Sequence, residues 1–466
     1  MPNLYNDIDI LFSEQFDFGH IYLLDYLSES LGLTKILSDI FPSNWKLILT
    51  LAEYFALDCS QSLDCSTWVK KANTELNPQL LYSQRKNGLF SSITNDSIFK
   101  FYEKWSSTVR DRDFFALDNT FLSTYSDDIL EAEYGYNRDR EKLKQINLSL
   151  IFGETSGLPL FSSLFHGNMN DVRTLKKTIE QFKLINQTNY SIFMDKNFFS
   201  LENINFLTTH NPPIKFTISL PQTVDMFEEL ILDTLPISSS NDSVIVTSSG
   251  ISMGVSKKIK WYNGTDLYAH VYRNYHEKLQ VEEIVKYNLI DMLNKATLNP
   301  ELYINDKTFN EVLNFRRSSK TESGYTVKIK PDMLSKKTLT SGWLILLSNC
   351  IKDTSQAIRK YRKKDVVEKA FDLFQNHNAL KGIKANSYIN LSSTVFVCFI
   401  SLILLSEIHD VMDTKNLYSI YSMRELLETL STQRVIHIKD KKILKPITID
   451  QRRLFKHFNC PLPNTS

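Results

Sequence analysis

The feature that most constrains the fold is a change of hydrophobic pattern after residue 113. From there to residue 220, helical spacing of apolar residues gives way to short apolar runs separated by polar turns. Short runs bounded by turn residues predict β-strands, and longer stretches with apolar residues every three or four positions predict helices. The segment therefore predicts the order β-β-β-α-β-α-β. Three meandering strands followed by alternating helices and strands indicate a mixed α/β sheet with helices packed on it.

The rest of the chain divides around this segment. Residues 1–107 are predicted to form a helical N-terminal domain, because apolar residues recur there at helical spacing. Residues 108–220 carry the first part of the sheet. Residues 221–338 do not continue the alternation of helices and strands, and their pattern predicts a β-rich insertion that also contains a helix. A buried strand, WLILLSN, and a long helix return in residues 339–410, and residues 411–466 form a basic C-terminal region.

Composition and the positions of cysteines and apolar residues argue against several kinds of site and segment. The formal net charge of the 466 residues is +1, so global charge gives no argument for nucleic acid. The five cysteines contain no Cys-x-x-Cys pair, which argues against a zinc site or a disulfide framework. The N-terminus has no signal-peptide pattern. The longest apolar run, residues 395–405, is shorter than the roughly 20 residues that span a bilayer, and it predicts a buried core helix in a cytoplasmic protein.

Three acidic residues stand out by position. Asp118 is predicted to end the first strand, Asp195 to end the strand after the first helix, and Glu368 to lie on the long helix. Carboxylates at the ends of buried strands are costly unless they are paired or bind a cation. Mg²⁺ prefers oxygen ligands, and two such ions about 4 Å apart suit phosphodiester chemistry. Among 53 acidic residues such a triple also arises by chance, so position alone favours ordinary strand-end caps.

The predicted long helix presents a face around the third acid. Tyr361, Lys364, Glu368 and Gln375 follow one another at i, i+3, i+7 and i+14, which places them on one side of a helix. Lys364 and its neighbour Arg362 are candidates for holding a phosphate near the carboxylate of Glu368. The alternative is a solvated basic helix.

Local charge indicates a polyanionic partner. From Lys307 to Lys364 the chain has fourteen Lys or Arg residues and four acids, and the basic residues include the pair Arg316-Arg317. Such clustering in a neutral protein is typical of a phosphate-binding surface, whereas ordinary soluble surfaces mix both signs. The pair Trp261-Tyr262 in the insertion either stacks on an unpaired base or fills the core of a small β domain.

Four stretches carry a resemblance to a known family. They are LDNTFLSTYS from residue 117, EAEYGYNRDREKLKQINLSLIFGETSGLPLFSSLFHGNMNDVRTL from 131, FMDKNFFSLENINFL from 193 and YRKKDVVEKAF from 361. Together they resemble the DDE transposases of bacterial insertion sequences. The subgroup is the one with a Tyr-x2-Arg-x3-Glu-x6-Lys helix and a β-rich insertion before the third acid. The resemblance is strongest over residues 110–220 and 340–405.

The resemblance implies a ribonuclease H-like core with a mixed five-stranded sheet. It implies that Asp118, Asp195 and Glu368 are the catalytic triad and the ligands of two Mg²⁺ ions, for which Mn²⁺ can substitute. Enzymes of the family cut at transposon ends by hydrolysis and then use a 3′ hydroxyl to attack target DNA. No cysteine or serine nucleophile is needed for either step.

The resemblance also implies a partner and its contacts. The expected partner is double-stranded DNA, at the terminal inverted repeats and at the target, bound by a homodimer in the nucleoid. The helical N-terminal domain is expected to contribute DNA-end binding or dimer contacts. The residues predicted to contact DNA are Tyr361, Arg362, Lys364, Lys196, Arg316, Arg317 and Trp261.

The sequence departs from the family pattern in three places. Lys196-Asn197 stands where Arg-Gly usually follows the second acid, Lys364 stands where Arg is usual, and Gln375 stands where Lys is usual. All three acids are present, which favours an active transposase. The departures keep two alternatives open: a catalytically inactive relative that binds DNA, and a ribonuclease H-like nuclease that cuts without preference for element ends.

Overall fold

The computed structural model divides the chain into two compact units. The first unit combines Met1–Phe193 with Arg362–Ser466, and the second unit is Met194–Tyr361. The residues that the structure describes are 14–57, 65–72, 79, 83–109, 111, 114–124, 129–134, 144–169, 171–185, 190–234, 244–247, 250–321, 323–331, 333–362, 388–438 and 441–464.

The N-terminal part of the first unit is helical, as predicted. Its helices are α2 (Gly19–Ser30), α3 (Leu33–Ile40), α4 (Trp45–Leu57), α5 (Cys65–Lys71), α6 (Ser83–Ser92) and α7 (Asn95–Thr108). The N-cap of α7 is Thr94, whose hydroxyl accepts a hydrogen bond from the Ser97 amide at 3.2 Å. Thr94 has extended backbone, which lets its side chain turn back to this free amide.

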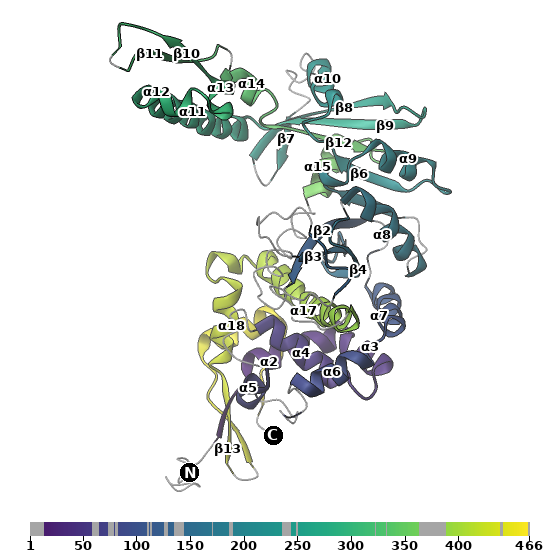
Figure 1. Ribbon diagram of the computed structural model, residues 1–466. Helices are drawn as coiled ribbons and strands as arrows, with labels where there is room; N and C mark the ends of the chain where they lie inside the picture. Colours follow the sequence, from purple (N-terminus) through teal and green to yellow (C-terminus); the bar gives the residue numbers. More distant parts are fainter. Residues whose placement is uncertain are drawn as a thin grey trace. The chain divides into compact units, whose positions relative to one another are not determined.

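A long apolar helix, α17 (Tyr388–Thr414), forms the core of the first unit. It packs against α4, α6 and strand β4 (Pro159–His166) (Figure 1). By length and composition it is the one helix among the described residues that is long and apolar enough to cross a membrane, but 78% of its apolar window is buried inside the protein. A helix that is apolar all round is typical of a core position, so the predicted core helix is confirmed.

The sheet of the first unit follows the predicted order of elements. Its strands β2 (Phe114–Thr124), β3 (Lys144–Gly153), β4 and β5 (Ser191–Met194) are arranged β4-β3-β2-β5, and helix α8 (Asp171–Ile185) connects β4 to β5. β2, β3 and β4 form an antiparallel meander. Nearly every residue of β3 is buried, as expected of an internal strand with both faces covered. The mixed α/β fold is confirmed.

The two ends of the chain meet in the first unit. Strand β1 (Glu14–Asp17) pairs with β13 (Arg434–Ile438), which pairs in turn with β14 (Lys441–Leu444). The helices α18 (Met423–Ser431) and α19 (Ile449–His457) complete the C-terminal part, and α18 packs against α2. The N-terminal and C-terminal regions, which the sequence analysis treats separately, therefore share one sheet.

The second unit is built on antiparallel strands. After α9 (Leu201–Thr209), strand β6 (Lys215–Ser219) pairs with β12 (Trp343–Ser348), the predicted buried strand WLILLSN. β12 also pairs with β9 (Asp266–Arg273), and β8 (Gly250–Lys260) and β7 (Val244–Thr247) follow beyond it. α10 (Asp225–Thr234) contacts β9. The strands of the predicted insertion thus extend the ladder of β6 and β12.

The remainder of the insertion is a small subdomain of the second unit. It contains α11 (Tyr275–Leu298), α12 (Pro300–Tyr303), α13 (Lys307–Val312), the hairpin of β10 (Leu313–Arg317) and β11 (Tyr325–Ile329), and α14 (Met333–Thr338). α11 lies beside the hairpin and its flanking helices (Figure 1), and apolar residues of all these elements form one core cluster. Gly342, with a φ of 72°, ends the subdomain just before β12. Its carbonyl accepts a hydrogen bond from the Asn274 amide at 2.7 Å. A Cβ at Gly342 would lie 2.4 Å from the Asn274 carbonyl oxygen, so glycine is required there.

Candidate active site

Asp118 lies inside strand β2 and not at its end. The strand continues to Thr124, because Asn119 to Thr124 keep pairing with Ser149 to Lys144 of β3. The prediction that Asp118 ends the first strand is therefore wrong. Its carboxylate is buried, at 8% exposure, and Oδ1 accepts a hydrogen bond from the Asn119 amide at 2.9 Å. The neighbouring Asn119 side chain bonds to Thr174 of α8, so Asp118 points from the opposite face of the sheet.

Asp195 directly follows the last residue of β5, as the sequence indicates. It precedes a short 3-10 helix, Lys196–Phe198, and its side chain does not cap that helix. Its Oδ1 atom instead accepts a hydrogen bond from the Tyr361 hydroxyl at 3.4 Å. β5 lies next to β2 in the strand order, so Asp195 follows the strand that neighbours the strand of Asp118.

Tyr361 is held in place by the packing of α15 (Thr354–Arg362). Ile358 of this helix joins Tyr272 and Leu346 in an apolar cluster, and Tyr361 packs against it. The Tyr272 hydroxyl donates to the carbonyl of Thr354 at 2.7 Å and so fixes the start of the helix. The tyrosine predicted to contact DNA thus touches the second candidate acid. The sequence gives no sign of this contact, because 166 residues separate the two.

Two basic candidates lie beside these residues in the chain. Lys196 is exposed immediately after Asp195. Arg362 is half-buried, and its Nη1 atom is buried with no hydrogen-bond partner among the residues that the structure describes. A buried guanidinium nitrogen without a partner is costly and suits an anionic ligand. Three further residues of interest, Glu368, Lys364 and Gln375, lie outside the described residues.

Arg316 and Arg317 are both exposed on strand β10 of the hairpin. Lys328 is exposed on β11, so the hairpin carries several cations on its surface. Lys330 instead donates to the carbonyl of Asn310 at 2.6 Å and helps to hold the hairpin. The arginines are therefore accessible to a phosphate, as the predicted contact requires.

Trp261 does not meet the requirement for stacking on a base. Its ring is 2% exposed and packs edge-on against Phe199, and its indole nitrogen donates to Oδ1 of Asn205 at 3.0 Å. The prediction that Trp261 contacts DNA is therefore wrong: it closes the contact between the β8–β9 turn and α9. Tyr262 beside it is 74% exposed. Alternation along the chain puts one ring of the pair inside and the other outside.

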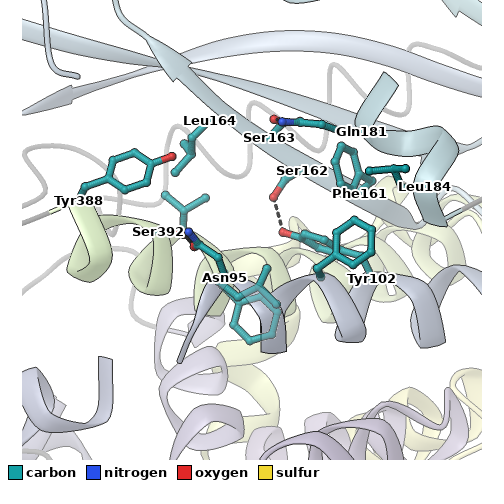
Figure 2. A pocket seen from close by; sticks show the side chains of 14 residues that line it. Asn95, Tyr102, Phe161, Ser162, Ser163, Leu164, Gln181, Leu184, Tyr388 and Ser392 are labelled. Atoms are coloured by element: carbon teal, nitrogen blue, oxygen red, sulfur yellow. Dashed lines mark hydrogen bonds between the residues drawn. The ribbon is translucent and has the colours of Figure 1, made fainter. Parts of the chain in front are cut away.

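A cavity of about 380 Å³ lies in the first unit, among α7, β4, α8 and α17 (Figure 2). Its polar side chains include Asn95, Gln181 and Tyr388, and the Tyr102 hydroxyl bonds to Ser162 at 2.5 Å on its wall. Burial raises the pKa of Tyr102, so this hydroxyl stays protonated. None of the cavity's lining residues is charged, and none of the predicted site residues lines it.

The predicted ligand set suits a hard divalent cation. Asp118 and Asp195 offer only carboxylate oxygens, which Mg²⁺ and Mn²⁺ accept and which zinc or copper sites rarely use alone. Asp118 is also buried, and a cation bound beside a buried carboxylate offsets the cost of burying its charge. Within the described part of the chain, no three His, Cys, Asp or Glu side chains form a group that could hold a metal. Glu368, the third predicted ligand, lies outside that part.

Comparison with known proteins identifies the family. Residues 110–404, more than half of the chain, match the family model described as "Transposase DDE domain". No curated protein matches the chain. Among the solved structures to which the chain is similar is the cryo-EM structure of a piggyBac transposase synaptic complex with hairpin DNA. The identity is 12% and the TM-score 0.34, over 89% of this chain and 70% of that chain. On the match of its family model, the chain belongs to the transposases that carry a DDE domain.

Proposed function

We propose that this transposase cuts DNA at the ends of its element and joins the freed 3′ ends to target DNA. In this proposal Asp118, Asp195 and Glu368 are the catalytic carboxylates and hold two Mg²⁺ ions. The observation that carries it is that Asp118 lies on β2 and that Asp195 directly follows β5, the strand next to β2 in the sheet. The hydrogen bond from Tyr361 to Asp195 supports the proposal, because it joins the second acid to α15, the helix that carries the predicted DNA contacts Tyr361 and Arg362.

Each described residue has a role that follows from its position. Asp118 is fixed by the sheet, and the Asn119 amide orients one of its carboxylate oxygens. Tyr361 orients Asp195 in the same way, which leaves the carboxylate few conformations to lose on binding a ligand. When bound, the two metal ions would activate the attacking oxygen and stabilise the leaving one. Lys196 and Arg362, next to Asp195 and Tyr361 in the chain, would bind phosphates on either side of the cut.

The proposed partner is duplex DNA, at the element's terminal repeats and at the target. The exposed arginines of the β10–β11 hairpin would bind its phosphates. Cutting and joining two ends of one element requires two active sites, so we propose a homodimer on DNA.

The experiment that tests the function is strand cleavage of a duplex that carries the element's own end, with Mg²⁺ or Mn²⁺. The proteins compared are the wild type and the variants Asp118→Asn, Asp195→Asn and Glu368→Gln. Each amide variant keeps the shape of the side chain and removes its charge. We expect cleavage by the wild type alone and similar DNA binding by all four proteins.

The other outcomes discriminate between the alternatives. Binding of the end without cleavage by the wild type would identify an inactive DNA-binding relative, and the departures at Lys196-Asn197 and Gln375 would then be examined first. Cleavage of unrelated duplexes as readily as the end would identify a nuclease. Retained cleavage in one variant would remove that residue from the site.

A further inference from the structure

Helix α11 of the second unit is buried on one face and carries exposed apolar residues, among polar ones, on the other. One face is buried in the insertion subdomain, where Leu289 and Ala296 form a core with Val312 and Leu313 of the hairpin region. Packing of this face explains how the helix is held on the hairpin. It does not account for the apolar residues on the opposite side.

The opposite face of α11 is exposed. It carries the apolar residues Leu279, Ile284, Tyr287, Ile290 and Leu298, whose exposure ranges from 55% to 77%. At 100° per residue these side chains lie within an arc of about 140°, centred opposite the buried face. A helix in water normally has a polar outer face, and gathered apolar residues there indicate a surface that binds another protein.

The spacing of this face is symmetric along the helix. Leu279, Glu283, Tyr287, Ile290, Asn294 and Leu298 follow one another at intervals of four, four, three, four and four residues. They fall within an arc of about 100°. The intervals read the same in both directions about the midpoint between Asn288 and Leu289. Two such helices in antiparallel orientation would place Leu279 opposite Leu298, Tyr287 opposite Ile290 and Glu283 opposite Asn294.

We propose that this face binds the same face of a second copy of the chain, with the two α11 helices antiparallel about a two-fold axis. A second copy fits because the residues of this face, read from the opposite end of the helix, have the same spacing and matching chemistry. Apolar residues meet apolar residues, and the Asn294 amide can donate to the Glu283 carboxylate, so the polar pair is satisfied at both ends. A two-fold interface requires this self-complementarity. The proposal rests on the homodimer of the proposed function and assigns it a surface.

The expected strength follows from the size of the contact. A helix of 24 residues is roughly 36 Å long, and a single pair of such helices is a small interface by the standards of permanent dimers. The free protein should therefore dimerise weakly, with a dependence on concentration. Two copies on one DNA molecule have a high effective concentration, which favours the pairing.

Cross-linking of single-cysteine additions tests the geometry. Leu279→Cys and Leu298→Cys are prepared separately and oxidised mildly, alone and mixed, with and without DNA. In the antiparallel dimer, identical positions lie about 28 Å apart along the axis, so neither variant alone forms a disulfide dimer. The mixture forms one. Wild-type protein, treated in the same way, controls for the chain's own cysteines.

Dimerisation itself is measured by sedimentation velocity across a concentration series. The double variant Tyr287→Glu/Ile290→Glu should shift the association at least tenfold toward monomer. Asn288→Glu, an exposed position of the same helix outside the face, should leave it unchanged. Circular dichroism melts establish that all variants are folded.

The proposal is overturned if the mixture gives no more dimer than each variant alone, both with and without DNA. It is equally overturned if each variant cross-links to itself, which would indicate parallel helices. End cleavage by the wild type is scored in a separate assay. A protein that cross-links without cleaving therefore contradicts the proposed chemistry and not this surface.

Discussion

The contact between Tyr361 and Asp195 assigns the tyrosine a positioning role at the scale of single residues. Tyr361→Phe removes this hydrogen bond to the Asp195 carboxylate, which should weaken metal binding more than folding. Hydrogen bonds to charged groups contribute about 1.5–3 kcal/mol. At 3.4 Å the lower end applies, so we expect about tenfold slower cleavage at limiting Mg²⁺, with recovery at high Mg²⁺.

A matched control comes from the same apolar cluster. Tyr272→Phe also removes a tyrosine hydroxyl, which there donates to the Thr354 carbonyl. This variant should lower the melting temperature without changing the Mg²⁺ dependence of cleavage. Identical Mg²⁺ titrations for Tyr361→Phe and the wild type would contradict the positioning role.

Trp261 makes a second residue-scale prediction, one about stability. Because the ring is buried and its nitrogen is bonded to Asn205, Trp261→Ala should destabilise the folded protein by about 3–5 kcal/mol. Tyr262→Ala, at the exposed neighbour, should change stability by less than about 0.5 kcal/mol. Urea denaturation measures both. If Trp261→Ala and Tyr262→Ala had equal free energies of unfolding, Trp261 would again be a candidate for contact with DNA.

Glu53 of α4 predicts a pH dependence. Its side chain is buried, and burial together with Asp25 raises the pKa of Glu53 well above its ordinary value. A raised pKa means that the folded state holds the proton more tightly than the unfolded state. The stabilising contribution is therefore complete below about pH 4 and is lost as the pH rises toward the folded-state pKa.

The variant Glu53→Gln keeps the shape of the side chain and cannot ionise. Its melting temperature should exceed that of the wild type by an amount that grows from pH 5 upward. Thermal melts of the two proteins over a pH series measure this difference. A constant difference across the series would show that Glu53 does not ionise with an altered pKa.

At the scale of elements, the exposed arginines of the hairpin β10–β11 allow the predicted DNA contact to be tested. Arg316→Gln/Arg317→Gln removes two exposed cations. If both contact phosphates, DNA affinity should fall and the slope of log affinity against log salt should become shallower by about two. Fluorescence anisotropy at several salt concentrations measures the slope.

A control of equal charge lies on strand β8. Lys258 and Lys260 both form ion pairs with Asp266, at 2.6 and 2.5 Å, so each ammonium group already has a carboxylate partner within the protein. Lys258→Gln/Lys260→Gln should leave the salt slope nearly unchanged. Equal slopes for the two double variants would remove the hairpin from the DNA contact.

The elements were largely predictable from the sequence, for a physical reason. The strands of the β-β-β-α-β-α-β segment are short apolar runs between turn residues, and periodicity marks them wherever a face is buried. The position of Asp118 within β2 could not be predicted, because Asn119 and Thr120 are polar yet continue the ladder with β3. Local polarity ends an apolar run but does not break backbone pairing.

At the scale of the whole molecule, contacts between distant segments could not be predicted from the sequence. The pairing of β1 with β13, and the hydrogen bond from the Tyr26 hydroxyl to the Asn459 carbonyl, join residues more than 400 positions apart. No periodicity within one segment reports such a partner. The same limit hid the role of Tyr361, whereas the candidate acids Asp118 and Asp195 were found from their positions relative to single strands.

The joining of both chain ends in the first unit has a consequence for synthesis. α4 and β1 are synthesised well before their partners α17 and β13, which follow the whole second unit along the chain. At about 5–20 residues per second, the first helices wait tens of seconds for the surface they pack on. The second unit, Met194–Tyr361, is uninterrupted and can fold while the chain is still growing. The order of folding then differs from the order of translation. The second unit can fold first, and the helices and strand made before it are packed only after α17 and β13 have been made.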